Sequence, residues 1–357
     1  MVGAEKLKPE SEPTRELLKK FQRARAQMRG LRKPASEDVF RRLALLHPDQ
    51  LHVVNYGRKR PLAAFNPGAL LNGNRLLIYP RLIFEYYWYA SSIGLLELKP
   101  ESLLRQEELG EVPVKVILYP SGPEDLRGCE DPRVQRIGGR NLMLYTSVSP
   151  SESGVEPRQS VAEVADEGMR RLGHLKMRYG DKYYVTFWKD SALIGEYLQG
   201  AWLLTRPSIP LPGGGFLEVG WSGPLDAEEW AVGVESMEPS LVSEDFEVKV
   251  GWSTNAVRLS SNEYLVGWHG VGVDYIYRNG LALVDGEGNL LGVSDYLLSP
   301  KPSIDEFYGD RPGVIFGCGL VGLQEYLLWV GGVADYAIGV WIAETEKVLE
   351  HVKYLRG

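Results

Sequence analysis

Acidic and basic residues gather at the ends of five similar segments of the chain. The residues just before these segments are Asn66-Pro67, Glu130-Asp131-Pro132-Arg133, Lys189-Asp190 and Thr254-Asn255. The strands that follow end in Arg81, Tyr145-Thr146, Arg206 and His269, with Asp335 just past the fifth. Carboxylates transfer protons, and arginine or histidine side chains bind anions. A fold that brings these ends together would therefore build one site with both capacities.

The five segments themselves repeat at a spacing of about 62 residues. They read NGNRLLIYPR from Asn72, GGRNLMLYTS from Gly138, LQGAWLLTRP from Leu198, SSNEYLVGWHG from Ser260 and GLQEYLLWVGG from Gly322. Each is a turn followed by an aliphatic and aromatic run, which is typical of a β-strand. A repeat of this length made only of strands fits one four-stranded blade. We therefore expect an all-β fold, a five-bladed β-propeller in which the inner strand ends meet at one mouth.

Helical periodicity is confined to the two ends of the chain. Apolar residues from Leu17 to Leu31 recur at three- and four-residue steps, and a second helix is predicted over 36–46, with Ser36 as its N-cap. The run WIAETEKVLEHVKYL also has helical spacing. The predicted organisation is an N-terminal helical arm over 1–50, the propeller over 51–345 and a C-terminal helix or tail over 346–357.

Composition limits the partners and the compartment that we expect. Residues 1–60 hold 15 Lys and Arg against 7 Asp and Glu, in a chain of net charge −7. The basic residues lie on predicted amphipathic helices without interleaved aromatic residues, so bracing or self-association of the arm is favoured over nucleic-acid binding. The N-terminus lacks the apolar core of a secretory signal, and no apolar run is long enough to span a bilayer. We expect a cytoplasmic protein without membrane partners.

Cysteine and histidine are sparse. Cys129 and Cys318 are the only cysteines, and the five histidines have no spacing typical of a metal site. We expect free thiols, and neither a metal nor an organic cofactor.

Five motifs in order resemble glycoside hydrolase family 130. They are FNPGALL, CEDPRV, WKDSAL, WHGVGVDYIYRNGLALVD and VGGVADYAIGVW, and the similarity covers about residues 60–345. The resemblance implies a five-bladed propeller that cleaves β-mannosidic bonds with inversion. The attacking group is phosphate in the phosphorylases, which release mannose 1-phosphate, and water in the hydrolases.

The resemblance also implies roles for individual residues. Asp131 matches the catalytic acid, whose proton is thought to pass through a hydroxyl of the bound mannose. The residues that match substrate-binding positions are Asn66, Arg81, Glu130, Arg133, Lys189, Asp190 and Asp335. Arg206 and His269 end inner strands from which they could hold phosphate, although each could instead pair with a nearby carboxylate. Arg258 is a candidate third phosphate ligand, since a lysine-bearing stretch of the family is replaced here by residues 254–258.

The residues leave the type of reaction open. An inverting hydrolase needs a base about 6.5–9.5 Å from the acid, whereas a phosphorylase needs cations that hold a dianion. The phosphorylases carry another basic residue where this chain has Phe187-Trp188. We favour phosphorolysis, with phosphate as the co-substrate. The alternatives are a hydrolase, with a base drawn from Glu196, Glu218 or Glu235, and a non-catalytic glycan-binding propeller.

Strand geometry makes two further predictions near the acid. In an extended strand Asp131 and Arg133 share one face and Glu130 points away. Arg133 would then favour the ionised form of Asp131, unless it pairs elsewhere. The aromatic cluster Tyr86-Tyr87-Trp88-Tyr89 is expected to pack in the core, with at most two rings in the cleft.

Overall fold

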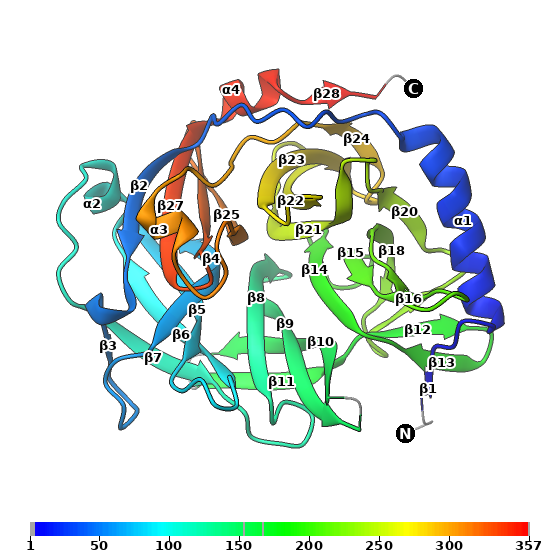
Figure 1. Cartoon of the computed structure of the whole chain (residues 1–357), viewed down its shortest axis with the longest axis horizontal. Coiled ribbons are helices and arrows are strands. Elements are labelled where there is room, and N and C mark those ends of the chain that lie inside the picture. The colour runs from blue at the N-terminus through cyan, green and yellow to red at the C-terminus, as the bar shows by residue number, and fades with distance from the viewer. Residues whose placement is uncertain (1–3, 153, 166–167, 356–357) are drawn as a thin grey trace.

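The chain folds mainly into β-strands, as expected. A computed structural model describes residues 4–152, 154–165 and 168–355 (Figure 1). The helices are short except the first, and they are α1 (Glu12–Met28), η1 (Pro48–Gln50), α2 (Pro100–Leu104), α3 (Ile304–Phe307) and α4 (Thr345–Glu350). None of the helices in these ranges is long and apolar enough to cross a membrane.

The strands form five consecutive antiparallel groups. The first two groups are β4 (Ala63–Asn72), β5 (Arg75–Ile83), β6 (Ser91–Leu98) and β7 (Val112–Leu118), then β8 (Gly128–Ile137), β9 (Arg140–Ser151), β10 (Gly154–Ala165) and β11 (Gly168–His174). A short strand β3 (Leu51–Val53) pairs in parallel with β7. One parallel bridge between Ser91 and Gly128 joins the two groups into a continuous sheet.

The third group is the most elaborate. It contains β14 (Trp188–Ile194), β15 (Trp202–Pro207), β18 (Gly220–Asp226) and β20 (Glu238–Leu241), and β18 continues into β19 (Ala231–Gly233), β12 (Lys176–Tyr179), β13 (Lys182–Val185) and β1 (Glu5–Lys6). A separate two-stranded ribbon is formed by β16 (Ile209–Pro210) and β17 (Phe216–Leu217).

The last two groups each recruit a strand from a chain terminus. The fourth is β21 (Glu247–Arg258), β22 (Glu263–Gly272), β23 (Tyr277–Asp285), β24 (Leu290–Val293) and the C-terminal β28 (Lys353–Tyr354). The fifth is β25 (Ile315–Leu323), β26 (Tyr326–Val333), β27 (Ala337–Glu344) and the N-terminal β2 (Arg41–Leu46). Both chain ends are therefore tied into the sheets.

The first strands of the five groups form a closed ring. β4 contacts β8, β8 contacts β14, β14 contacts β21, β21 contacts β25 and β25 contacts β4. Figure 1 shows these five strands around the centre of the molecule. The beginnings of the ring strands line one cavity and their ends line another. The ring thus has two mouths, here called the front mouth and the rear mouth.

Aliphatic and tryptophan side chains between the sheets hold the groups in place. The largest fully buried side chains include Trp188, Trp221, Trp252, Trp268 and Trp329. Each such ring buries an area whose removal from water stabilises the fold by several kcal/mol, about 25 cal/mol per Å². Cys129 and Cys318 are buried free thiols, as expected, and burial raises their pKa values well above the ordinary range.

The first predicted helix is present as α1, but the second is not. Residues 41–46 instead form β2, which pairs along β27. The open edge of β27 offers a row of backbone hydrogen bonds, and this pairing overrides the helical preference of a leucine-rich segment. At the other end of the chain, Trp341–Glu344 belongs to β27, and only α4 is helical.

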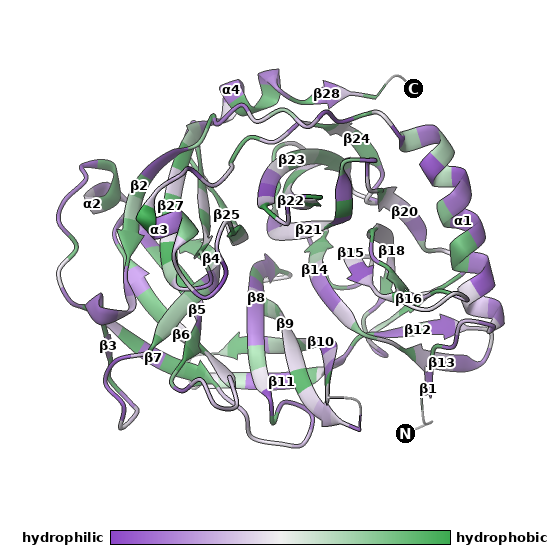
Figure 2. Cartoon of the chain, viewed as in Figure 1, coloured by the Kyte–Doolittle hydropathy of each residue, from purple (hydrophilic) through white to green (hydrophobic). Residues whose placement is uncertain are grey.

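Helix α1 packs along the third group through an apolar stripe, visible as alternating colours in Figure 2. Lys20 lies within this stripe and is only 8% exposed. Its Nζ donates to the carbonyl oxygens of Val234, Glu235 and Met237 at 3.2, 2.7 and 2.8 Å, and lies 2.9 Å from Glu238 Oε1. The helix therefore braces the body; self-association through it stays a prediction.

Replacing Lys20 should destabilise the protein. Lys20→Met leaves three carbonyl oxygens, two of them in buried hydrogen bonds, without this donor, so we expect the free energy of unfolding to fall by about 2–3 kcal/mol. Urea unfolding measures this change, and Lys19→Met, on the exposed face of the same helix, is the matched control. Equal stability of the two variants would show that α1 does not brace the body through Lys20.

Candidate active site

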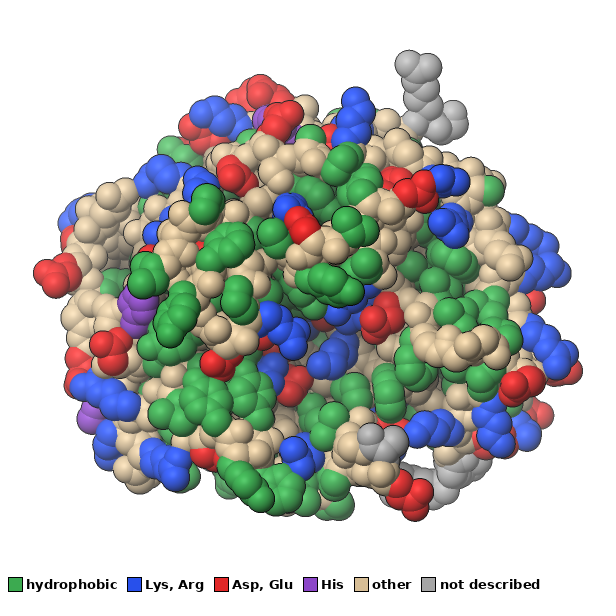
Figure 3. Space-filling view, in the orientation of Figure 1, with side chains coloured by type: hydrophobic (Ala, Val, Ile, Leu, Met, Phe, Trp, Pro, Cys, Tyr) green, Lys and Arg blue, Asp and Glu red, His purple; other side chains and the backbone are tan. Residues whose placement is uncertain are grey.

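A cavity of about 520 Å³ opens at the front mouth of the ring. Figure 3 shows Lys or Arg and Asp or Glu side chains together in the hollow at the centre of this face. Nine of the predicted site residues line the cavity: Asn66, Arg81, Glu130, Asp131, Lys189, Asp190, Arg206, His269 and Asp335. The further lining residues include Tyr86, Tyr89, Lys249, Tyr277, Asp310, Arg311 and Phe316.

A bulge at the same level in every ring strand positions these side chains. The register with the second strand shifts at Phe65/Gly68, Glu130/Arg133, Lys189/Ala192, Trp252/Ala256 and Gly317/Gly319. Asn66, Asp131 and Asp190 occupy these bulges with φ of 44°, 48° and 56°. Asparagine and aspartate tolerate this left-handed backbone better than most residues, and Pro67 and Pro132 have no N–H to lose from the ladder. The bulges therefore turn polar side chains into the cavity.

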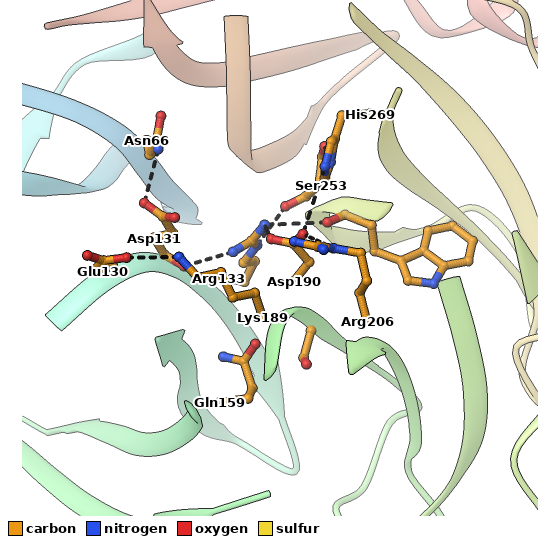
Figure 4. A network of polar contacts seen from close by, with 12 residues as sticks. Asn66, Glu130, Asp131, Arg133, Gln159, Lys189, Asp190, Arg206, Ser253 and His269 are labelled. Carbon is orange, nitrogen blue, oxygen red and sulfur yellow. Dashed lines mark hydrogen bonds and ion pairs between the residues drawn. The ribbon is translucent and has the colours of Figure 1, made fainter. Parts of the chain in front are cut away.

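Asp131 lies at the centre of one polar cluster (Figure 4). Its Oδ1 accepts from Asn66 Nδ2 at 3.0 Å and lies 3.4 Å from Arg81 Nη1. Its Oδ2 has no hydrogen-bond partner among the described residues. Asn66 Oδ1 and Arg81 Nε are also buried without a partner in that set. Buried polar atoms left unpaired are costly, so this cluster is suited to bind a hydroxyl-bearing ligand.

Glu130 points into the same cluster, and the prediction that it faces away is wrong. The bulge interrupts the alternation of the strand, so consecutive residues both reach the cavity. Glu130 Oε1 accepts from Arg81 at 2.8 Å and Oε2 from Lys189 at 3.2 Å. Burial favours the neutral acid, but Arg81 and Lys189 outweigh it and lower the pKa of Glu130.

Asp190 is the centre of a second, deeper cluster. Its Oδ1 accepts from Arg133 Nη2 at 2.8 Å, and its Oδ2 accepts from Arg206 Nε at 2.6 Å. Burial opposes ionisation here, but Arg206 and Arg133 hold the pKa of Asp190 well below its usual range. Asp190 is therefore a buried carboxylate that fixes two guanidinium groups.

Arg133 does not occupy the position expected from the sequence. Its side chain is 1% exposed, lies beneath the cavity and is not part of its lining. It donates to Asp190 and to the backbone oxygens of Ser253 and Asp131, at 2.7 and 2.9 Å for the last two. The bulge changes the face on which Arg133 lies relative to Asp131, so Arg133 pairs elsewhere and does not form an ion pair with the Asp131 carboxylate.

Basic and aromatic groups converge on the side of the cavity next to Arg206. His269 Nδ1 lies 3.0 Å from Ser253 Oγ, and Nε2 lies 3.8 Å from Asp190 Oδ2, which is beyond hydrogen-bond distance, so Nε2 can still donate to a ligand. Burial, assisted by the charge of Arg206, lowers the pKa of His269 to about 3, so the imidazole is neutral. Gly251 makes room for this arrangement, since a Cβ there would lie 2.7 Å from Arg206 Cδ.

Lys249 completes this basic cluster and was missed by the sequence analysis. It is the third residue of β21, the strand that also contains Gly251, and its Nζ lies 5.2 Å from the centre of the Tyr277 ring. It has no ion-pair or hydrogen-bond partner among the described residues. Its only sequence signal is its place two residues before Gly251, at the start of an inner strand.

Arg258 does not belong to the front mouth, which corrects its predicted role. It ends β21, lines the rear cavity and pairs there with Glu196. Strand β21 is 12 residues long, so its start and end lie at opposite mouths. The lysine-bearing stretch of the family was matched to residues 254–258 at the end of this strand, whereas the basic residue that lines the front cavity, Lys249, lies near its start.

The aromatic cluster is a turn between β5 and β6 and not a core element. Tyr87 and Trp88 are 88% and 55% exposed, which contradicts core packing. Tyr86 and Tyr89 line the cavity, so the prediction that at most two rings reach the cleft is confirmed. Tyr89 Oη lies 3.4 Å from Asp310 Oδ2 across the cavity rim.

Asp335 lies at the edge of the Asp131 cluster, 3.7 Å from Arg311 Nε. Burial outweighs the attraction of Arg81 and Arg311 and raises the pKa of Asp335 to about 6. The pKa of Asp335 is higher in the folded than in the unfolded protein. The free energy of unfolding therefore falls as the pH rises from about 4 to 6, and this loss persists above pH 6.

Asp335→Asn should therefore stabilise the ligand-free protein at pH 7. We expect a gain of about 1–3 kcal/mol in unfolding free energy, which shrinks as the pH falls toward 4 because the native carboxyl is then protonated. Urea unfolding of both proteins at pH 7 and pH 4.5 measures this. If the two proteins differ in unfolding free energy by the same amount at both pH values, ionisation of Asp335 does not destabilise the folded protein.

The comparisons with known proteins agree with this architecture. Residues 30–354 match a family model described as β-1,4-mannooligosaccharide phosphorylase. The chain is 26% identical over 303 residues to a β-1,2-mannobiose phosphorylase of Thermoanaerobacter sp. (strain X514), covering 80% of this chain and 91% of the relative.

Solved structures share the fold. A β-1,2-mannobiose phosphorylase from Listeria innocua in complex with β-1,2-mannobiose superimposes with a TM-score of 0.68 at 18% identity, covering 86% of this chain and 96% of that one. A mannose phosphorylase from Leishmania mexicana in complex with a phosphate ion gives 0.58 at 13% identity, covering 95% and 96%. The chain therefore belongs to glycoside hydrolase family 130 and is an enzyme of the glycoside phosphorylase or glycoside hydrolase type.

Proposed function

We propose that this enzyme is an inverting β-mannoside phosphorylase that releases mannose 1-phosphate. The observation that carries the proposal is that one cavity holds both a carboxylate cluster around Asp131 and a basic cluster of Arg206, Lys249 and His269. We also infer that the five strand groups are the blades of a five-bladed β-propeller, because their first strands form a closed ring.

The Asp131 cluster is the proposed sugar side of the cavity. Asp131 Oδ2 has no hydrogen-bond partner among the described residues and would accept from a mannose hydroxyl, while Asn66 and Arg81 hold the other carboxylate oxygen in place. Asp335, on the same side, would accept from further hydroxyls. Asp131 would deliver the proton that the departing sugar oxygen needs, directly or through a hydroxyl of the bound mannose.

The basic cluster is the proposed phosphate side. Lys249 Nζ, His269 Nε2 and the Arg206 guanidinium can donate to phosphate oxygens, and charge-assisted bonds of this kind are stronger than neutral ones. Lys249 replaces Arg258 in this assignment. The phosphorylases carry another basic residue at the position of Phe187-Trp188, and Lys249 would supply the positive charge that is missing there. The Trp188 side chain is buried and donates a hydrogen bond to Thr205.

Hydrolysis remains the second candidate because one predicted base lies beside the cavity. Glu218 Oε1 accepts from Arg206 Nη1 at 2.6 Å. Although burial opposes it, Arg206 and Lys249 lower the pKa of Glu218, so it is an ionised carboxylate. Glu196 lies at the rear mouth. A non-catalytic propeller is not retained, because the family model and the curated relative are both described as phosphorylases.

A substrate panel tests the proposal. The purified enzyme is incubated with β-1,2-, β-1,3- and β-1,4-mannobiose, each with and without inorganic phosphate, and free mannose and mannose 1-phosphate are quantified. We expect mannose 1-phosphate with at least one linkage and no turnover without phosphate. Equal release of mannose with and without phosphate would assign the enzyme to the hydrolases, with Glu218 as the base to test.

A further inference from the structure

A second cavity lies beside the active site, in the first strand group. It has a volume of about 560 Å³, and its wall includes Asn55, Tyr56, Phe84, Ser92, Val116 and Tyr119; we call it the Tyr56 cavity. Phe84 directly follows β5, Ser92 is the second residue of β6 and Tyr119 directly follows β7. Because these strands are antiparallel to their neighbours, these three ends lie at the same edge of the sheet as Asn66 in β4. The Tyr56 cavity therefore opens on the side of the front mouth.

One turn separates the two cavities. Tyr86 and Tyr89 line the active-site cavity, while Glu85 and Ala90, in the same turn, line the Tyr56 cavity. A ligand that extends outward from the active site across this turn would reach the Tyr56 cavity.

Three aromatic residues, Tyr56, Phe84 and Tyr119, contribute to the wall of the Tyr56 cavity. Tyr56 and Phe84 contact edge to face with ring centres 5.0 Å apart. Tyr56 and Tyr119 are 48% and 59% exposed, so parts of both rings are open to a ligand. Exposed aromatic faces next to a hollow are suited to pack against the C–H face of a pyranose ring.

Ser92 provides a buried polar group in the same cavity. Its side chain is 6% exposed, and Oγ has no partner among the described residues. Ser92 shares a sheet face with Gly94, two residues on, and Gly94 pairs with Val116, which lines the cavity. Ser92 therefore lies on the cavity side of the sheet, and a rotation about its Cα–Cβ bond would turn the unpaired hydroxyl toward a ligand.

The charged and amide groups of the cavity are already occupied. Asn55 exchanges two hydrogen bonds of 2.9 Å with the backbone of Val116. The Glu85 carboxylate accepts from the backbone N–H groups of Trp88 and Ala90 at 2.8 and 3.4 Å. A charged ligand would find no free counter-ion here, whereas a neutral polyhydroxylated ligand with an apolar face matches the wall.

We propose that the Tyr56 cavity binds a hexopyranose unit of an oligosaccharide whose reacting end occupies the active site. This rests on the proposed function, because it takes the substrate to be a mannoside chain. The cavity then makes the enzyme select for longer chains, while a disaccharide gains nothing from it.

Substitution of the two exposed rings tests the proposal. For Tyr56→Ala combined with Tyr119→Ala, we expect kcat/KM with β-mannopentaose to fall by about 10-fold or more, while kcat/KM with mannobiose of the same linkage changes less than two-fold. Ser92→Ala should lower the pentaose value by several-fold. Tyr87→Ala, an exposed ring of the intervening turn that lines neither cavity, is the matched control and should change neither value.

The outcomes separate this proposal from the proposed function. Turnover of mannobiose by the unmodified enzyme tests the function alone, and the ratio of the two kcat/KM values tests the cavity. An unchanged ratio in the double variant overturns the proposal. Sedimentation measures the oligomeric state of both proteins. If the unmodified protein is a dimer, the double variant is a monomer and the ratio is unchanged, the cavity binds a second copy of the chain. If neither sugar is turned over, binding of the pentaose is measured by calorimetry. Loss of binding in the double variant supports the proposed sugar site in the Tyr56 cavity, and equal binding by both proteins overturns it.

Discussion

Asp131→Asn is expected to lower kcat for phosphorolysis of a β-mannobiose by about 10²- to 10⁴-fold, the usual contribution of a positioned acid. Asparagine keeps the size of the side chain and can still contact Asn66 and Arg81, but it cannot give up a proton. Mannose binding, measured by calorimetry, should therefore stay within a few-fold of the unmodified value. A variant with more than a tenth of the original kcat would remove Asp131 from its proposed role.

A substrate with a better leaving group sharpens this test. A nitrophenyl β-mannoside needs little protonation of its departing oxygen, so Asp131→Asn should lose far less activity on it than on mannobiose. Asp335→Asn is the comparison variant in the same cavity, and it should raise KM for both substrates without this difference. The same loss on both substrates for Asp131→Asn would indicate that the residue binds sugar and transfers no proton.

Lys249→Met is expected to raise KM for phosphate by about 10- to 100-fold, because a hydrogen bond to a charged group contributes about 1.5–3 kcal/mol. The unfolding free energy should fall by no more than about 1 kcal/mol, since Lys249 has no ion-pair or hydrogen-bond partner among the described residues and the variant loses a cation–π contact with Tyr277 and a longer-range attraction to Glu218. Initial rates at varied phosphate and saturating mannobiose measure the effect, together with a urea unfolding curve.

Arg258→Met is the matched control, because it removes a positive charge from the other end of the same strand. It should leave KM for phosphate unchanged. A larger effect of Arg258→Met than of Lys249→Met would contradict the assignment of the phosphate side. Arg206→Met is less informative, because it leaves the buried carboxylate of Asp190 with one partner fewer and should also cost stability.

Sequence reasoning predicted which distant residues share one cavity, because it relies on where the strands end. The repeated turn-and-strand segments fix where each inner strand begins, and residues at equal distances from the turns lie at one level of the ring. Asn66, Asp131, Arg206, His269 and Asp335 therefore line one cavity although they span most of the chain. The all-β class followed from the same repeats.

The wrong sequence predictions concern residues whose position depends on bulges or on distant strands, which a local sequence pattern does not reveal. A bulge in each ring strand interrupts the alternation of side chains, so simple alternation misplaced Glu130 and Arg133. Arg258 was chosen because residues 254–258 replace a lysine-bearing stretch of the family, but it lies at the opposite end of β21 from Lys249. Residues 41–46 have the leucine content of a helix, but they are recruited by the edge of β27. That edge is far away in the sequence, and its hydrogen bonds exist only once the sheets have assembled.

The central claim is that acid and phosphate act from two sides of one sugar in a single cavity, and phosphorus NMR of the reaction with a β-mannobiose tests it most directly. We expect inorganic phosphate to be consumed while α-mannose 1-phosphate and free mannose form in equal amounts. The α-anomer is expected because attack from the side opposite the leaving group inverts the anomeric centre. Formation of the β-anomer, or release of mannose while the phosphate signal stays constant, would contradict it.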